Sequence, residues 1–174
     1  MFKRNDPLKK AFETLYTVRL FRDRVSRLYN RLDERRSELK ARMLLLESKG
    51  ESYLAKRYAE ETVKLEGLLK NLATIQLVLD KVDIALQHAI VMREFNTLVL
   101  ELKPLIEELS KLPIIRNIPE MGLLLADLEE SVRELADLQT SPPNITYSVP
   151  TTSEVKAVLE EAREALKKKL EPSA

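Results

Sequence analysis

The spacing of helix-breaking residues is the feature that most constrains this chain. Asp6 and Pro7 have the form of a helix N-cap and a first helical residue, and no further turn signal occurs before residues 49–52, Lys-Gly-Glu-Ser. Ser52 can cap a second helix, which the next strong break, Pro104, ends. Only three glycines occur in 174 residues, which leaves few turn positions for a β-rich fold. The sequence therefore predicts an all-α protein.

The apolar side chains of both long helices recur at steps of three, four or seven residues. In the first helix the repeat comprises Val18, Phe21, Val25, Leu28, Leu32, Leu39, Met43 and Leu46. In the second helix it comprises Leu54, Tyr58, Leu65, Leu68, Leu72, Ile75, Leu79, Val82 and Leu86, and continues through Met92, Phe95, Val99 and Leu102. Such narrow stripes pack against one partner helix, and a four-residue turn makes the two helices antiparallel. We expect a long hairpin over about residues 7–103, extended and non-globular.

Both long helices carry further apolar side chains outside these stripes. They are Leu20, Leu44, Leu45, Leu69, Leu77, Ile84, Ile90 and Leu98. A covering surface is needed for them, either from later segments of the chain or from another molecule.

Shorter helices are predicted after the hairpin. A short helix is expected at 105–112, and the apolar connector that follows it leads to an acidic helix at 120–138. Residues 140–153 contain three prolines and no charged residue, which is typical of an extended linker. A last amphipathic helix is expected at 154–171. We therefore divide the chain into a helical core, residues 1–139, the linker, and a C-terminal helix that binds a partner.

Charge is distributed unevenly along the chain. The formal net charge is only +1, although 33% of the residues are charged. Residues 1–49 contain 14 basic and 7 acidic side chains, whereas residues 101–140 contain 4 basic and 9 acidic ones. Such asymmetry favours a polyanionic partner for the basic part, or charge-complementary packing between segments or copies.

The sequence lacks the components of most active sites. It has no cysteine and one histidine, His88, which we interpret as a structural residue. No phosphate-binding glycine loop and no nucleophile beside a base is present. We expect no catalytic residues, no metal, no cofactor, no small-molecule substrate and no enzymatic activity. The charged N-terminal residues, and the lack of any long apolar run, predict a cytoplasmic protein.

Four arginines repeat along one edge of the first predicted helix. Arg24, Arg27, Arg31 and Arg35 follow one another at steps of three and four residues, with Arg42 further along the same edge. We call the first four the arginine row. It could bind membrane phosphates, a nucleic-acid backbone or an acidic protein, and its plainest alternative is a solvated face paired with neighbouring carboxylates.

The N-terminal residues suit a membrane surface. Phe2 can enter the interface while the cations of Lys3, Arg4, Lys9 and Lys10 meet anionic headgroups. A frayed terminus is the alternative interpretation.

The order of these parts resembles a known family. A basic hairpin, a proline break, a short helix, the connector LPIIRNIPEMG, an acidic helix, a proline-bearing linker and a terminal helix follow one another. This arrangement resembles the ESCRT-III proteins, and most closely their archaeal cell-division branch, the CdvB family, of which the chain looks like a shorter paralogue. The resemblance covers roughly residues 5–140, and its most specific part is 104–138.

The resemblance implies a function and partners. Members of that family polymerise with themselves and with related subunits on anionic membranes, which they constrict or cut, and an AAA ATPase remodels them through its MIT domain. Their basic hairpin face meets lipid, which assigns the arginine row to membrane binding here. It also implies a cytoplasmic protein, peripheral on the inner face of the cell membrane at the division site.

The family's tail motif, L-x-x-R-L-x-x-L-K, is matched only in part by the last predicted helix. The outer leucines and the lysine of the motif are present, while Ala162-Arg163 stands where the family has Arg-Leu. The predicted partner-binding residues of this tail are Val155, Leu159, Ala162, Arg163, Leu166, Lys167 and Leu170.

Opposite charges on the hairpin and the acidic helix predict a switch. In a closed monomer the acidic helix would fold against the basic hairpin and mask it, and opening would free both the arginine row and the connector for neighbours. The residues assigned to self-assembly or autoinhibition are Ile114, Ile115, Ile118, Met121, Leu124, Leu128, Glu129, Glu130 and Glu134.

The leading hypothesis is thus a filament subunit that binds anionic membranes. One alternative is a nucleic-acid-binding helical protein that uses the same arginines. Nucleic acid is disfavoured, because the basic region lacks aromatics to stack on bases and the acidic segment would repel a phosphate backbone. A second alternative is a coiled-coil scaffold that does not polymerise.

Overall fold

The computed structural model describes residues 6–138 and 152–170, and every regular element in them is a helix. Two units divide the chain, residues 1–141 and 142–174, and each is described by itself. The all-α class, with two long helices followed by shorter ones, is confirmed. Phe2, Lys3 and Arg4, and the predicted linker except its end, lie outside the described residues.

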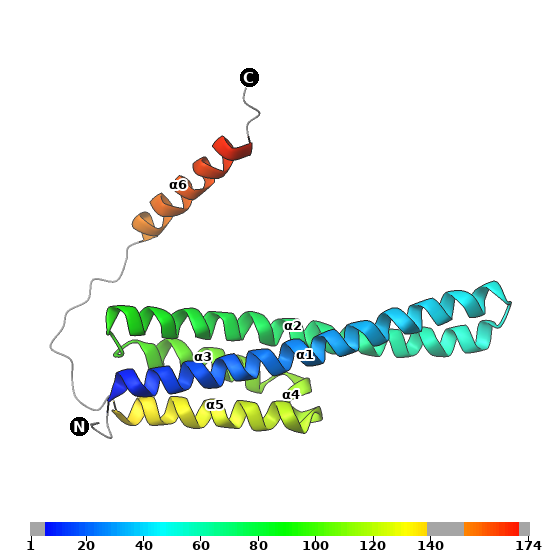
Figure 1. The fold of residues 1–174 in the computed structure, drawn as a ribbon, viewed down its shortest axis with the longest axis horizontal. Coiled ribbons are helices and arrows are strands. Elements are labelled where there is room, and N and C mark those ends of the chain that lie inside the picture. Colours follow the sequence, from blue (N-terminus) through cyan, green and yellow to red (C-terminus); the bar gives the residue numbers. More distant parts are fainter. Residues whose placement is uncertain (1–5, 139–151, 171–174) are drawn as a thin grey trace. The chain divides into compact units, whose positions relative to one another are not determined.

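Helices α1 (Pro7–Ser48) and α2 (Ser52–Met92) form the predicted antiparallel hairpin (Figure 1). The Asp6 carboxylate accepts a hydrogen bond from the backbone N–H of Leu8 at 3.0 Å, and so caps α1 as its sequence predicts. Gly50 adopts a φ of 77° in the connection, a left-handed conformation that glycine reaches without steric cost.

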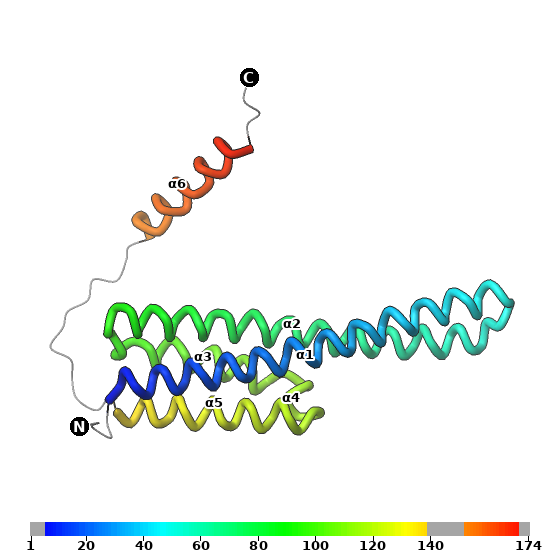
Figure 2. The backbone as a smooth tube through the Cα atoms, viewed as in Figure 1, coloured from blue at the N-terminus to red at the C-terminus, as the bar shows by residue number. Residues whose placement is uncertain are grey.

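Three further helices cover the open end of the hairpin, which is the end that lies away from the Gly50 connection. They are α3 (Leu98–Ser110), α4 (Pro113–Asn117) and α5 (Pro119–Leu138). Helix α5 packs along α1, while α3 contacts both α2 and α5, so that four helices enclose one core. Figure 2 shows α1 and α2 continuing side by side well beyond α3, α4 and α5. The hairpin therefore has a covered open end and an uncovered closed end.

The predicted extension of the second helix to residue 103 is wrong. Helix α2 ends at Met92, because Arg93 adopts a left-handed conformation with a φ of 54° and its N–H bonds to the carbonyl of Ala89. The chain then turns back and α3 begins at Leu98, with Pro104 inside it. Pro104 and Leu100 are both exposed, so the carbonyl left without a partner lies on the solvent side of α3. The reversal buries apolar residues of α3 against α2, which a continuous helix would leave exposed.

The core of this unit comprises apolar residues from all five helices. Its largest fully buried side chains are Phe21, Leu72, Ile75, Leu79, Leu86, Leu98, Leu102, Leu109, Ile114, Met121, Leu128 and Leu135. Leu98 was predicted to need a covering surface, and as the first residue of α3 it is buried in this core. The connector predicted as an apolar segment contains α4, with Ile114 fully buried.

The closed end of the hairpin has only a thin core. Beyond residue 31 of α1 and before residue 71 of α2, the buried side chains are Leu39, Ala55, Thr62 and Leu69. Each helix there covers only one face of the other. This half of the hairpin consequently leaves much of both helices open to solvent.

A buried carboxylate fixes the register of the two long helices. Asp83 of α2 is only 4% exposed and accepts hydrogen bonds from Arg22 at 3.1 Å and Arg19 at 3.4 Å, both on α1. Gln87 also donates to Asp83. A buried charge is costly unless it is paired, so sliding one helix past the other by a turn is disfavoured.

The second unit contains α6 (Thr152–Leu170). It begins two residues earlier than the helix predicted at 154–171, and its last residue is one earlier than predicted. None of its described residues is buried. Its apolar residues nevertheless share one side of the helix, including Val155, Leu159 and Leu166.

Candidate functional site

The arginine row lies on an exposed edge of α1. All four side chains are exposed, and those of Arg24 and Arg27 are 48% and 65% accessible. Arg27 pairs with Asp23 at 3.2 Å, one turn away on the same helix. Within the described residues, Arg31 and Arg35 form no ion pair. The row is therefore a solvated cationic edge with two arginines available for an anionic partner.

A shallow groove with partly apolar walls runs beside the arginine row. Half-buried Leu28 and Leu32 lie next to Arg31 and Arg35 there, together with two glutamates of α1. The aliphatic parts of arginine side chains can lie along such apolar surface while their charged ends reach solvent. Apolar groups and guanidinium groups are thus available on the same edge.

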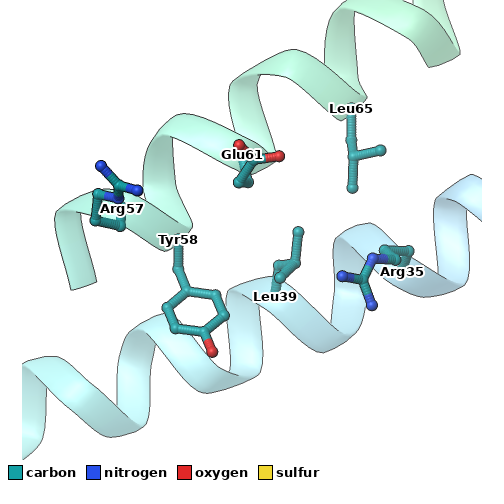
Figure 3. Close-up of a pocket in the computed structure, with 6 residues that line it drawn as sticks. All are labelled: Arg35, Leu39, Arg57, Tyr58, Glu61 and Leu65. Atoms are coloured by element: carbon teal, nitrogen blue, oxygen red, sulfur yellow. The ribbon is translucent and has the colours of Figure 1, made fainter. Parts of the chain in front are cut away.

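A second groove lies further toward the closed end of the hairpin, between α1 and α2, and shares Arg35 with the first (Figure 3). Its lining residues are Arg35, Leu39, Arg57, Tyr58, Glu61 and Leu65. Leu39 and Leu65 project toward each other across it, and Tyr58 extends from α2 over α1. Arg57 was missed by the sequence interpretation, which considered only arginines of the first helix. Because the chain reverses at Gly50, the first turns of α2 lie beside the last turns of α1. Pairing the two predicted helices in this register would have identified Arg57.

The two described lysines of the predicted N-terminal membrane site lie in different environments. Lys9 is exposed. Lys10 is 17% accessible and pairs with Glu13 of α1 at 3.2 Å and with Glu134 of α5. Lys10 thus contributes to the docking of α5.

Helix α5 docks on the first half of α1 through both apolar and polar contacts. Ser131 is buried and its hydroxyl lies 2.6 Å from the hydroxyl of Thr14. Glu120, at the start of α5, reaches Arg24 at 3.9 Å. Arg27, Arg31 and Arg35 lie further along α1 and are exposed, as Arg24 also is. The docked α5 therefore contacts the arginine row only at its first member.

Two other acidic residues of α5, Glu129 and Glu130, lie away from the row. Glu130 pairs with Arg133 of its own helix at 3.1 Å. Glu129 is half-buried and lines a groove between α3 and α5 with Lys103 and Glu107. Of the acidic residues of α5, Glu120 and Glu134 thus contact α1, and only Glu120 reaches the arginine row.

The apolar residues predicted for self-assembly or autoinhibition lie in the core. Those buried are Ile114, Ile115, Met121, Leu124 and Leu128, while Ile118 is half-buried. They hold α4 and α5 against the hairpin. They can face another molecule only after these helices separate from it.

In α6, by contrast, every residue predicted to bind a partner is exposed. These residues are Val155, Leu159, Ala162, Arg163, Leu166, Lys167 and Leu170. An amphipathic helix with an exposed apolar side is typical of segments that dock in a groove of another protein.

Large apolar side chains are also exposed on the hairpin. Some lie at its closed end, including Leu45 and Tyr53, and others on the outer side of α2, including Leu77, Ile84 and Val91. Of these, the sequence interpretation identified the leucines and Ile84 as needing a cover, and it missed Tyr53 and Val91. Helical spacing alone predicts which face is apolar, but an isolated exposed tyrosine or valine carries no such signal.

The described residues contain no group of acidic or histidine side chains that could hold a metal ion. Nor does any helix within residues 6–138 and 152–170 have the length and apolarity to cross a bilayer.

Comparison with known proteins finds a similar protein whose name refers to cell division. It is 25% identical over 162 residues to Cell division protein B1 of Sulfolobus acidocaldarius, and the match spans 92% of this chain and 75% of the relative. No family model and no solved structure matches the chain. A match of this extent supports a relationship to the CdvB-like family at low identity.

Proposed function

We propose that this chain is a non-enzymatic subunit of a cell-division filament, which binds anionic membrane through the arginine row. The exposed row beside a partly apolar groove is the observation that carries the proposal. Similarity to Cell division protein B1 supports the role in division. The filament contains further copies of the chain and related ESCRT-III-like subunits, and lies on the cytoplasmic face of the membrane at the division site.

The charges of the arginine row suit a membrane surface. Each Lys or Arg near an anionic leaflet contributes about 1 kcal/mol to binding, so four of them together give substantial affinity. The attraction decays over a Debye length of about 8 Å at physiological salt, and binding should therefore weaken as salt rises. Because all four arginines stay exposed and only Arg24 pairs with the docked α5, the closed form can already bind lipid.

Lipid binding by the closed form differs from the mechanism that the charge pattern predicts, in which the acidic helix masks the arginine row. The switch need not unmask the row, because α5 covers little of it. We infer that separation of α4 and α5 from the hairpin instead exposes their apolar residues, such as Ile114 and Leu128, to a neighbouring subunit. Exposed ion pairs contribute about 0–1 kcal/mol each, whereas burial of a large apolar side chain gives about 1.5–3 kcal/mol. Apolar contacts would thus supply most of the energy of assembly.

The exposed apolar side of α6 supports a role in partner binding. An MIT domain of an AAA ATPase is the partner that we propose. Leu159, Leu166 and Lys167 fit the corresponding recognition motif, while Ala162 and Arg163 depart from it.

Co-sedimentation with vesicles tests the membrane assignment. The variant R24Q/R27Q/R31Q/R35Q removes the charge of the arginine row without introducing acidic side chains. Its matched control, K70Q/K81Q/K103Q/K111Q, removes the same charge from exposed residues of α2, of α3 and of the C-cap that follows α3. We expect the first variant to bind anionic vesicles about a hundredfold more weakly or worse, because it loses four cations near the surface. The control should lose much less.

Equal losses in the two variants would contradict a specific role of the row, since only net charge would then matter. A gel-shift measurement at physiological salt examines the nucleic-acid alternative. Tight binding to duplex or single-stranded nucleic acid, lost in the arginine variant, would favour that alternative.

A further inference from the structure

The closed end of the hairpin combines exposed apolar side chains with an excess of cations. We call residues 40–57, the last turns of α1, the connection and the first turns of α2, the hairpin tip. Four large side chains are exposed there: Leu44 by 66%, Leu45 by 54%, Tyr53 by 73% and Leu54 by 46%. No helix of residues 6–138 other than α1 and α2 extends to this end (Figure 1). No other helix of residues 6–138 therefore covers these four side chains.

All four apolar side chains lie close to the end of the hairpin. Leu44 and Leu45 lie within about a turn of the end of α1 at Ser48, and Tyr53 and Leu54 lie in the first turn of α2. At 1.5 Å per residue, each is within about 6 Å of its helix end along the axis. The hairpin therefore presents its apolar side chains at one end.

The same residues carry positive charge. Residues 40–57 include five basic side chains and only two acidic ones, Glu47 and Glu51. Lys40 pairs with Glu66 at 3.1 Å, whereas Arg42, Lys49, Lys56 and Arg57 form no ion pair within the described part of the chain. A second protein chain could cover apolar residues equally well, but the surrounding unpaired cations favour an anionic surface.

The tip also continues the arginine row. Arg42 follows Arg35 after seven residues, and Leu45 and Lys49 follow at steps of three and four residues. The spacing places these residues along one edge of α1 as far as the helix extends. Contact between that edge and a membrane would therefore bring the tip to the same surface.

We propose that the hairpin tip inserts Leu44, Leu45, Tyr53 and Leu54 into the interface of an anionic lipid bilayer. The cations beside them meet the headgroups, and the phenol of Tyr53 suits the boundary between acyl chains and water. This inference rests on the proposed membrane function and specifies which residues enter the bilayer. The tip then acts as the apolar anchor, while the arginine row supplies electrostatic attraction.

A fluorophore attached to the tip reports its insertion directly. The chain has no cysteine, so Tyr53→Cys and Val91→Cys each provide a single labelling site in the full chain. Both residues are well exposed, at 73% and 78%, and Val91 lies at the other end of α2. Each variant is labelled with an environment-sensitive dye and mixed with anionic vesicles whose lipids carry a quencher in the acyl chains. Co-sedimentation is measured on the same samples.

We expect the dye at position 53 to shift to shorter wavelength and be quenched, while the dye at position 91 does neither. If position 53 stays in water although the protein sediments with the vesicles, the insertion is wrong and the membrane function stands. If neither variant nor the unmodified chain sediments, both are wrong. The dye at position 53 could also shift without vesicles, and increasingly so as the protein concentration rises. That result would show that the tip contacts another protein chain, and it would also overturn the proposal.

A second pair of variants measures the contribution of the tip to affinity. L45S/Y53S removes two apolar side chains from the tip, and I84S/V91S removes two similarly exposed ones from the outer side of α2. The tip variant should bind anionic vesicles about tenfold more weakly or worse, because it loses apolar transfer into the bilayer. The control should bind as the unmodified chain does, and equal loss in both would contradict the insertion.

Discussion

The hydroxyl pair of Thr14 and Ser131 is a buried polar contact between α1 and α5. The Thr14 hydroxyl donates to the carbonyl of Lys10 at 2.8 Å, so the Ser131 hydroxyl donates to Thr14 across 2.6 Å. A buried polar group without a partner costs about 1–3 kcal/mol, so each hydroxyl stabilises the docked helix only while the other is present.

A double-mutant cycle tests this pair. We expect T14V to lower the free energy of unfolding by about 1–3 kcal/mol, because it leaves the Ser131 hydroxyl without its acceptor. The double variant T14V/S131A should cost less than the sum of the single changes, since neither buried hydroxyl remains. Urea titration gives the three values. Additive costs would show that the hydroxyls do not interact.

Two glycines within helices differ in their surroundings and therefore in their expected response to alanine. Gly67 of α2 has open space where a Cβ would lie, whereas a Cβ at Gly122 of α5 would meet the backbone oxygen of Ile115 at 3.2 Å. G67A should raise the free energy of unfolding by about 0.5–1 kcal/mol, because alanine is the better helix former. G122A should give a smaller gain or a loss, because α4 approaches at that point. Urea titration of both variants measures the two changes in the free energy of unfolding. A larger increase for G122A than for G67A would contradict the close packing of α4 against α5.

At the scale of elements, the long helices are predictable and their connections are less so. Most of the stripes of α1 and α2, the Asp6 cap and the Gly50 turn follow from residue type and spacing, although the predicted stripe residues Leu54 and Met92 are exposed. The end of α2 does not, because Arg93 adopts the left-handed conformation without being a glycine, and Pro104 lies on an exposed side of α3. Both features depend on the apolar packing of α3 against α2, which local sequence does not encode.

Docking of α5 depends on its buried apolar residues, and one of them offers a matched comparison. Leu128 is fully buried, whereas Leu123 of the same helix is 69% exposed. L128A should lower the free energy of unfolding by about 2–5 kcal/mol and increase hydrogen exchange along α5, because it leaves a cavity beneath that helix. L123A should change the free energy by no more than about 0.5 kcal/mol. Similar effects of both changes would mean that α5 is not held by this face.

For the whole molecule, the uneven distribution of charge is visible in the sequence, but its arrangement in space is not. The basic first third and the acidic later segment suggest that one masks the other. The packing of residues such as Met121 and Leu128 instead sets the position of α5, and leaves Arg27, Arg31 and Arg35 in solvent. Apolar contacts therefore determine which charged side chains remain exposed to a partner. The pattern of charge along the sequence could not predict which ones these are.

Electron microscopy of the full chain with vesicles tests most directly whether it assembles on anionic membrane. The protein is incubated with anionic vesicles and, as a control, with neutral vesicles of the same size at physiological salt. We predict ordered filaments on the anionic vesicles and few on the neutral ones, because the cationic row selects the surface. Bare anionic vesicles, with the protein remaining as a small discrete oligomer in solution, would contradict the account and favour a scaffold that does not polymerise.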